Sequence, residues 1–231
     1  MKLHAWIGDT GHCSRREAQR LIKAGRVTVD GRVAGIHTPV REDADIRIDG
    51  VRLGPRRKYV YIMLNKPVGV VCTMARSVEG NIADFISSDT AISPVGRLDK
   101  DSEGLLLLTN HGDVSQRLLH GEHEREKEYR VTVDKPLTAA ALEGMAAGVE
   151  MLGTVTKPCR TEQAGERTFH IVLTQGLNRQ IRRMCRAFDY RVERLQRVRI
   201  MELELGDLDM GAWRELTEAE RIKLLQPLGL L

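Results

Sequence analysis

Five residues near position 56 set the first limit on the fold of this chain: Gly54-Pro55-Arg56-Arg57-Lys58. Gly and Pro interrupt regular structure, and three consecutive cations resist burial, so one hydrophobic core is not expected to continue through this segment. The 231 residues suffice for one large domain or two small ones. We therefore predict a small domain over residues 1–54, a linker over 55–60 and a larger domain over 61–231.

The first fifty residues have the pattern of a helix followed by short hairpins. Ser14 and Glu17 match the S-x-x-E capping box, which predicts a helix that begins there. Apolar residues then recur at helical spacing as far as Gly25, which supplies a stop. The dipeptides Asp30-Gly31 and Asp49-Gly50 predict two-residue turns between short strands.

Positive charge is concentrated in two segments of the chain. The formal net charge is only +4, yet residues 1–60 carry 13 Lys and Arg against 7 Asp and Glu, and residues 175–200 carry 8 against 2. Clustered cations favour a polyanionic partner, because neutralising phosphates releases counterions. Basic faces that only contact solvent are the alternative interpretation.

Several classes of protein are disfavoured by what the sequence lacks. No run approaches the roughly 18 apolar residues of a membrane span, and the first residues do not resemble a signal peptide. The four cysteines are far apart, and the seven histidines show no metal-ligand spacing. We therefore expect a cytoplasmic protein with free thiols, no bound metal and no contact with a membrane.

The order of predicted elements after the linker is irregular, unlike the strict alternation of a doubly wound parallel sheet. It favours an α+β domain with a mixed, mainly antiparallel sheet. The predicted strands and helices lie at 59–64, 105–108, 129–133 and 169–174, and at 138–147 and 179–188, respectively.

A polar loop, GRLDKDSEG at 96–104, directly precedes the apolar run 105–108. A loop fixed by a buried strand can hold a functional carboxylate in place, although most aspartates in such loops only cap or contact water. The residues alone thus make Asp99 a candidate catalytic group and leave both interpretations open.

The segment QGLNRQIRRMCRAF at 175–188 predicts an amphipathic helix with Asn178 as its N-cap. Its apolar side holds Ile181, Met184, Cys185 and Phe188, and its basic side holds Arg179, Arg182, Arg183 and Arg186. Neighbouring arginines repel one another unless anions oppose them. Acids from elsewhere in the fold and phosphates of a nucleic acid both satisfy this requirement.

The N-terminal motifs, SRREA at 14–18 and GRVTVDG at 25–31, resemble those of the S4 RNA-binding domain. The resemblance covers residues 1 to about 52 and implies that the helix and the turn contact RNA. Exposed cations beside a helix N-terminus agree with this, because they suit phosphates. The residues implied in RNA binding are Ser14, Arg15, Arg16, Arg20, Lys23 and Arg26.

The larger domain resembles RNA pseudouridine synthases of the RsuA type in four segments: NKPVGV at 65–70, GRLD at 96–99, Glu128-Tyr129, and GLNRQIRRM at 176–184. Together with the S4-like module, the resemblance covers nearly the whole chain. It implies isomerisation of a uridine in RNA by one aspartate, with no cofactor or metal. Segments at 107–113, 153–157 and 213–217 are most similar to members that modify large-subunit (23S) ribosomal RNA, and a tRNA is a further candidate substrate.

The resemblance also implies roles for individual residues. Asp99 matches the aspartate, which can attack or stabilise C1′ or abstract a ribose proton. Arg182 matches a basic residue that pairs with this aspartate, and Tyr129 matches a tyrosine that stacks on the target base. Arg97 fills the gap that the extruded nucleotide leaves. The other residues expected at the substrate are Ile181 on the apolar side of the pocket, Lys66 and Pro67 in its floor, and Arg179 and Arg183.

Two other functions are compatible with the motifs. A noncatalytic S4-type RNA-binding or ribosome-assembly protein would use residues 60–231 only as a scaffold. A nucleoside glycosidase would use Asp101 as the second acid beside Asp99. We expect the chain to act as a monomer.

Overall fold

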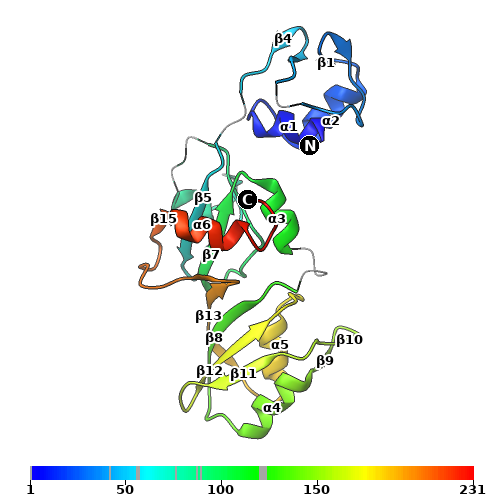
Figure 1. Ribbon diagram of the computed structural model, residues 1–231. Helices are drawn as coiled ribbons and strands as arrows, with labels where there is room; N and C mark the ends of the chain where they lie inside the picture. The colour runs from blue at the N-terminus through cyan, green and yellow to red at the C-terminus, as the bar shows by residue number, and fades with distance from the viewer. Residues whose placement is uncertain are drawn as a thin grey trace. The chain divides into compact units, whose positions relative to one another are not determined.

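The computed structural model describes residues 2–41, 43–55, 58–75, 77–86, 88, 90–119 and 124–231 (Figure 1). The chain divides into two compact units, Met1–Val60 with Ser88–Ala91, and Tyr61–Ser87 with Ile92–Leu231. Arg56 and Arg57 of the predicted linker lie outside the described residues. The domain limits at 54, 60 and 61 stay predictions.

The first unit packs two helices and a four-stranded antiparallel sheet around its own core. The sheet has the order β2-β1-β3-β4. The elements are α1 (Leu3–Asp9), α2 (Arg15–Lys23), β1 (Val27–Val29), β2 (Arg32–Val33), β3 (Ile46–Ile48) and β4 (Val51–Arg52).

The turn signals of this unit act as predicted, and of the predicted capping box the Ser14 half forms, whereas the Glu17 carboxylate accepts from Arg20 at 3.1 Å. The Ser14 hydroxyl accepts a hydrogen bond from the Glu17 backbone N–H at 3.2 Å, so it caps α2. Asp30 and Asp49 have φ angles of 48° and 50°, and a glycine follows each of them. These left-handed pairs are the conformation that tight hairpins require.

The second unit contains the large sheet. Its elements are β5 (Tyr61–Lys66), η1 (Ile82–Asp84), β6 (Ser93–Pro94), β7 (Glu103–Thr109), α3 (Gly112–Leu119), β8 (Lys127–Val133), α4 (Ala139–Ala147), β9 (Glu150–Met151), β10 (Thr154–Val155), β11 (Arg160–Gln163), β12 (Thr168–Leu173), α5 (Gln180–Ala187), β13 (Val192–Ile200), β14 (Leu203–Glu204), β15 (Trp213–Glu215) and α6 (Glu218–Leu225). Figure 1 shows α4 and α5 beside β8, β11 and β12, whereas α3 and α6 lie beside β5 and β7.

The strands of this sheet have the order β11-β12-β8-β13-β7-β5-β15. Among the named strands of the described chain, β13 and β7 pair in parallel and all other pairs are antiparallel. The predicted α+β class with a mixed, mainly antiparallel sheet is therefore confirmed. The parallel pair joins two antiparallel halves, β11-β12-β8-β13 and β7-β5-β15.

One core cluster lies between α5 and the first of these halves. The buried side chains of β8 and β12 that face α5 include Val131, Phe169 and Ile171, and α5 contributes Ile181 and Met184. The apolar side of the predicted helix is thus the buried side, and its arginines face away from the core.

The predicted N-cap of this helix is wrong. Arg179, not Asn178, is the N-cap residue, and it has a left-handed φ of 51°. The side chain of Gln180 reaches back to accept the Leu177 N–H at 3.0 Å, which satisfies a backbone donor before the helix begins. Asn178 instead receives hydrogen bonds from Arg183, on its backbone oxygen at 3.1 Å and its side-chain oxygen at 3.4 Å.

None of the helices in the described part of the chain is long and apolar enough to cross a membrane.

The parallel ladder depends on the absence of a side chain at Gly104. Gly104 has a φ of +103°, and a Cβ built there would lie 2.3 Å from the Arg197 backbone oxygen. We predict that Gly104→Ala lowers the free energy of unfolding by about 2 kcal/mol or more, because backbone strain and the collision both act. Urea titration checks this, with Gly176→Ala as control, since a Cβ at Gly176 meets nothing within 4 Å. Equal loss in both variants would contradict the role of the close approach.

Candidate active site

A cleft of about 540 Å³ in the second unit collects most of the predicted catalytic residues. It lies between the loop that precedes β7, one face of β8 and β13, and the segment that leads into α5. Among the residues of the described chain that line it, Asp99 is the one carboxylate, and the cations are Arg97, Arg125, Lys127, Arg179 and Arg197. The cleft is therefore strongly electropositive around a single acid.

The backbone of the Asp99 loop is fixed from several sides. The Gly69 N–H donates to the Lys100 carbonyl at 2.7 Å, and the Leu98 N–H donates to Cys72 Sγ at 3.3 Å. A turn closes the loop, because the Ser102 N–H donates to the Asp99 carbonyl at 3.1 Å. The Asp99 side chain remains 41% exposed, so it is held in place yet open to solvent.

Lys66 is buried under the neighbouring 67–70 turn and does not line the cleft. Its side chain is fully buried, and its ammonium donates to the carbonyls of Pro67 and Val70 at 2.8 Å each. Burial lowers the pKa of Lys66. The ammonium thus holds the 67–70 turn, and neither Lys66 nor Pro67 lines the cleft, so their place in the pocket floor stays a prediction.

Arg179 is the arginine that comes nearest to the candidate aspartate. Its guanidinium lies 3.7 Å from Asp99 Oδ2 and forms a two-pronged hydrogen bond with Asp101 at 2.8 and 3.1 Å. The bond from Arg179 lowers the pKa of Asp101, and the charge of Arg182 lowers it further. Acids from another part of the fold thus oppose this part of the arginine stripe.

Arg182 was predicted to pair with Asp99, but in the structure it contacts Asp101 instead. Its guanidinium donates to the Asp101 carbonyl at 2.7 Å and to the Val192 carbonyl at 3.2 Å, and its Nε lies 3.4 Å from Asp101 Oδ2. The side chain is 14% exposed. Arg182 therefore ties the loop, α5 and β13 together, and it acts on Asp99 through the loop.

The remaining predicted substrate residues divide between cleft and surface. Tyr129 and Ile181 line the cleft, the first half-buried and the second only 4% exposed, so Ile181 belongs to both the core and the cleft wall. Arg97 is exposed and lines the cleft two residues before Asp99. Arg183 is exposed and does not line the cleft, but it bonds to Asn178, which does.

Three cations of the cleft were not predicted: Arg125, Lys127 and Arg197. Arg125 and Lys127 lie just before the Glu128-Tyr129 motif, whereas Arg197 lies outside the motifs that drew attention to the site. Strand alternation offers a signal, because Lys127 shares a strand face with Tyr129, and Arg197 shares one with Leu195.

Most residues predicted to bind RNA in the first unit are engaged within it. Ser14 caps α2, so its hydroxyl is part of the helix terminus. Three arginines form ion pairs: Arg15 with Asp9, Arg20 with Glu17, and Arg26 with Asp49. Arg16 and Lys23 are exposed and have no ion pair with a described residue.

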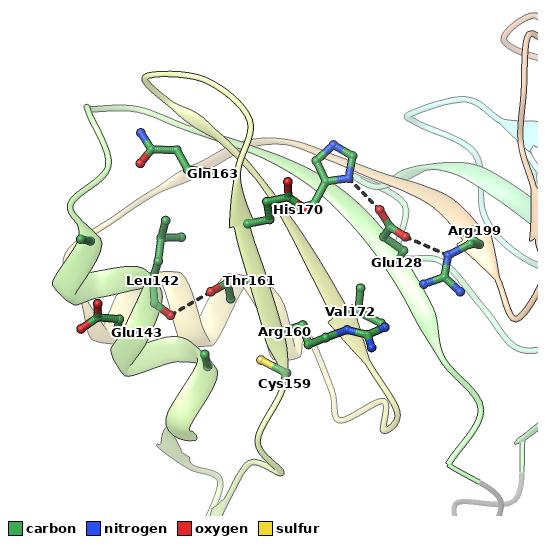
Figure 2. A pocket seen from close by; sticks show the side chains of 13 residues that line it. Glu128, Leu142, Glu143, Cys159, Arg160, Thr161, Gln163, His170, Val172 and Arg199 are labelled. Carbon is green, nitrogen blue, oxygen red and sulfur yellow. Dashed lines mark hydrogen bonds and ion pairs between the residues drawn. The ribbon is translucent and has the colours of Figure 1, made fainter.

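A second cavity, of about 810 Å³, lies at the sheet edge formed by β11 and α4 (Figure 2). Glu128 of β8 and His170 of β12 line this cavity. Each is next in sequence to a residue that points to the other face, Tyr129 and Ile171 respectively, so the cavity opens on the sheet face opposite to that of Tyr129. Figure 2 shows Glu128 between His170 and Arg199, with hydrogen bonds of 2.8 Å to each. Its lining contains none of the predicted site residues.

No group of three or more His, Cys, Asp or Glu side chains in the described part of the chain is arranged to hold a metal ion.

Comparison with known proteins gives concordant matches for both units. The family model of RNA pseudouridylate synthases matches residues 60–187, and that of the S4 domain matches residues 1–46. The dual-specificity RNA pseudouridine synthase RluF of Escherichia coli K12 is 46% identical over 228 residues, which cover 98% of this chain and 79% of that protein. An uncharacterized RNA pseudouridine synthase of Aquifex aeolicus is 34% identical over 239 residues, covering all of this chain and 96% of that protein.

A solved structure agrees with these sequence matches. The crystal structure of a pseudouridylate synthase superposes with a TM-score of 0.71 at 29% identity, and the match covers 97% of this chain and 99% of the other.

The contact between Arg179 and Asp101 gives a testable titration. Because this pairing depresses the pKa of Asp101, the carboxylate stays charged as pH falls until that lowered value is reached. We predict that Arg179→Met raises the pKa of Asp101 toward its ordinary value, measured by NMR titration of the side-chain carboxyl carbon. Arg183→Met is the control, since Arg183 bonds to Asn178 and not to an acid. An unchanged Asp101 titration in Arg179→Met would contradict the pairing.

Proposed function

This chain belongs to the RNA pseudouridylate synthase family, and we propose that it isomerises a uridine of large-subunit (23S) ribosomal RNA with Asp99 as its catalytic carboxylate. The chain is an RNA pseudouridine synthase: it breaks the bond between ribose and N1 of uracil and joins the same base through C5. The observation that carries the assignment of Asp99 is that it is the single carboxylate among the described residues lining an otherwise cationic cleft.

The chemistry asked of Asp99 fits its surroundings. It is partly exposed, so an extruded nucleotide can reach it, and the guanidinium of Arg179 lies 3.7 Å from its Oδ2. An ionised carboxylate can attack C1′ and later leave, or it can remove the C2′ proton. Either route expels the base with the electron pair of the broken bond on N1. Addition of C5 to C1′ then displaces the carboxylate on the first route, or is accompanied by return of the proton to C2′ on the second. Loss of the C5 proton and protonation of N1 complete the isomerisation.

The neighbouring residues have supporting roles. Tyr129 stacks on the base, and Ile181 forms the apolar wall opposite. Arg97 occupies the gap in the stacked RNA, where its exposed side chain can reach. Arg182 is a positioning residue, because it holds the loop backbone at Asp101 rather than the reacting atoms. Arg179 and Arg183 contact phosphates at the rim.

The RNA target is proposed from two sources. Segments of the sequence at 107–113, 153–157 and 213–217 resemble members that act on 23S ribosomal RNA. The Escherichia coli relative is named a dual-specificity RNA pseudouridine synthase, which supports a second kind of RNA substrate, and we propose a tRNA for it. We propose that the chain acts as a monomer in the cytoplasm, where the S4-like unit adds affinity for the folded RNA through Arg16, Lys23 and their neighbours.

The glycosidase alternative is less compatible with the site. Asp101 would have to act as a second acid, yet Arg179 and Arg182 hold it as a carboxylate with a lowered pKa. A general acid needs a raised pKa at neutral pH. Free uracil among the products would favour this alternative, since a synthase keeps base and ribose joined.

We predict that Asp99→Asn abolishes isomerisation while RNA affinity changes little, because the substitution removes the ionised carboxylate and preserves shape. Release of tritium from RNA labelled at C5 of uridine measures the reaction, and filter binding measures affinity. Asp207→Asn, at an exposed position outside the cleft, is the matched control and is expected to be fully active. Full activity of Asp99→Asn would overturn the assignment.

The role of the S4-like unit predicts a change in salt dependence. Replacing Arg16 and Lys23 together by Gln should weaken RNA binding and reduce the slope of log affinity against log salt by roughly 1 to 2, because each lost phosphate contact removes about 0.7 to 0.9. The control is Arg41→Gln with Arg52→Gln, which removes the same charge from residues that pair with Asp30 and Asp45. Equal slopes for the two double variants would argue against this RNA-binding surface.

A further inference from the structure

Arg197 is a buried cation in the floor of the cleft that the roles above leave unused. It lies on β13, is 3% exposed and lines the cleft. Its Nε donates to the Leu105 carbonyl at 2.7 Å, whereas its Nη2 is buried without a hydrogen-bond partner among the described residues. A buried charged donor without a partner is costly, so such a group is expected to serve a ligand.

Lys127 is a second cation beside it. It lies on the adjacent strand β8, lines the same cleft, and donates to the Arg125 carbonyl at 3.2 Å. Burial and the charge of Arg197 lower the pKa of Lys127 to about 8. Neither cation has an ion pair with an acid in the described part of the chain.

The two cations lie on the strand face that presents Tyr129. Arg197 and Tyr129 are direct partners across the β13–β8 ladder, and Lys127 is two residues before Tyr129 on the same face. Arg197 is also the partner of Gly104, five residues after Asp99, in the parallel ladder. Arg197, whose Nη2 has no partner among the described residues, is thus a direct neighbour of the tyrosine on which the base is proposed to stack.

We propose that Arg197 and Lys127 bind the carbonyl oxygens of the target uracil and stabilise the negative charge of the base after it leaves the ribose. This inference rests on the proposed function and extends it to the leaving group. When the bond from C1′ to N1 breaks, the electron pair stays on the base, and its charge is shared between N1, O2 and O4. Fixed cations at these oxygens lower the barrier because they interact more strongly with the anion than with neutral uridine.

The depth of Arg197 favours the base over a phosphate as its ligand. A backbone phosphate is joined to a sugar on each side, so it is met by exposed side chains at a rim. A residue that is only 3% exposed and lies beside Tyr129 across the ladder is better suited to a flat base that has swung into the cleft. Arg179 and Arg183, which are exposed, are better placed for phosphates.

Arg197→Gln tests the proposal with little disturbance of packing. The Gln amide nitrogen lies the same number of bonds from Cα as Arg Nε, so it can keep the bond to Leu105 while the cationic end is removed. Lys127→Met is the second variant, which removes the ammonium and retains an apolar stem. Arg130→Gln is the control, because Arg130 is an exposed cation of β8 on the opposite strand face.

Single-turnover isomerisation, RNA affinity and thermal melting are measured for each full-length variant. We expect Arg197→Gln to lose about 10²-fold in rate, the size typical of removing one donor from an oxyanion site, with RNA affinity and melting temperature nearly unchanged. We expect a smaller loss in the same direction for Lys127→Met and none for Arg130→Gln. If Arg197→Gln is unstable, Lys127→Met carries the test.

A second RNA substrate, with fluorine at C5 of the target uridine, tests whether the two cations act on the departing base. Fluorine at C5 of the target uridine withdraws electrons and makes the detached base a weaker base, so bond breaking depends less on the cations. The rate defect of Arg197→Gln, measured as loss of N-linked nucleoside, should therefore be at least several-fold smaller on the fluorinated RNA.

Three outcomes would overturn the inference: the same defect on both RNAs, loss of affinity and salt slope without loss of rate, or full activity of both variants. If the wild-type chain itself fails to isomerise uridine, the proposed function fails instead, and the two failures are thereby distinguished.

Discussion

The parallel ladder between β7 and β13 is the constraint on which the site depends. It joins two antiparallel halves of the sheet at Gln196–Glu103 and Arg197–Gly104. The Asp99 loop enters β7 on one side of this junction, and Tyr129 of β8 lies across β13 on the other. Gly104 permits the close approach, because any side chain there would collide with the Arg197 backbone. Acid, ring and buried cations therefore meet where the halves join.

The charges around the cleft are arranged so that each acid of the loop has a different role. The Asp101 carboxylate accepts a bidentate hydrogen bond from Arg179, and its backbone carbonyl accepts one from Arg182. These bonds fix the loop to α5. Asp99 is left with one guanidinium at 3.7 Å and solvent access. Asp101 therefore binds the two arginines, whereas Asp99 stays accessible to an extruded nucleotide.

Local patterns in the sequence predicted the family and part of the elements, but they did not predict α3, α6 or β13. The capping residue Ser14, the turn at Asp30-Gly31 and the apolar side of α5 are short-range signals that the fold retains. The identity of the partner of Arg182 was not predictable, because Asp99 and Asp101 are two residues apart and only the turn at Ser102 decides which one faces the helix. Arg197 was missed because its importance lies in pairings with Gly104 and Tyr129, which are distant in sequence.

A crystal structure of this chain bound to RNA with fluorine at C5 of the target uridine tests the central claim most directly. The account predicts a nucleotide turned out of the RNA into the 540 Å³ cleft, with the Asp99 carboxylate about 3–3.5 Å from C1′ or the C2′ hydrogen and the base over Tyr129. A target base that stays stacked in the RNA, or that enters the 810 Å³ cavity at β11 and α4 instead, would contradict it.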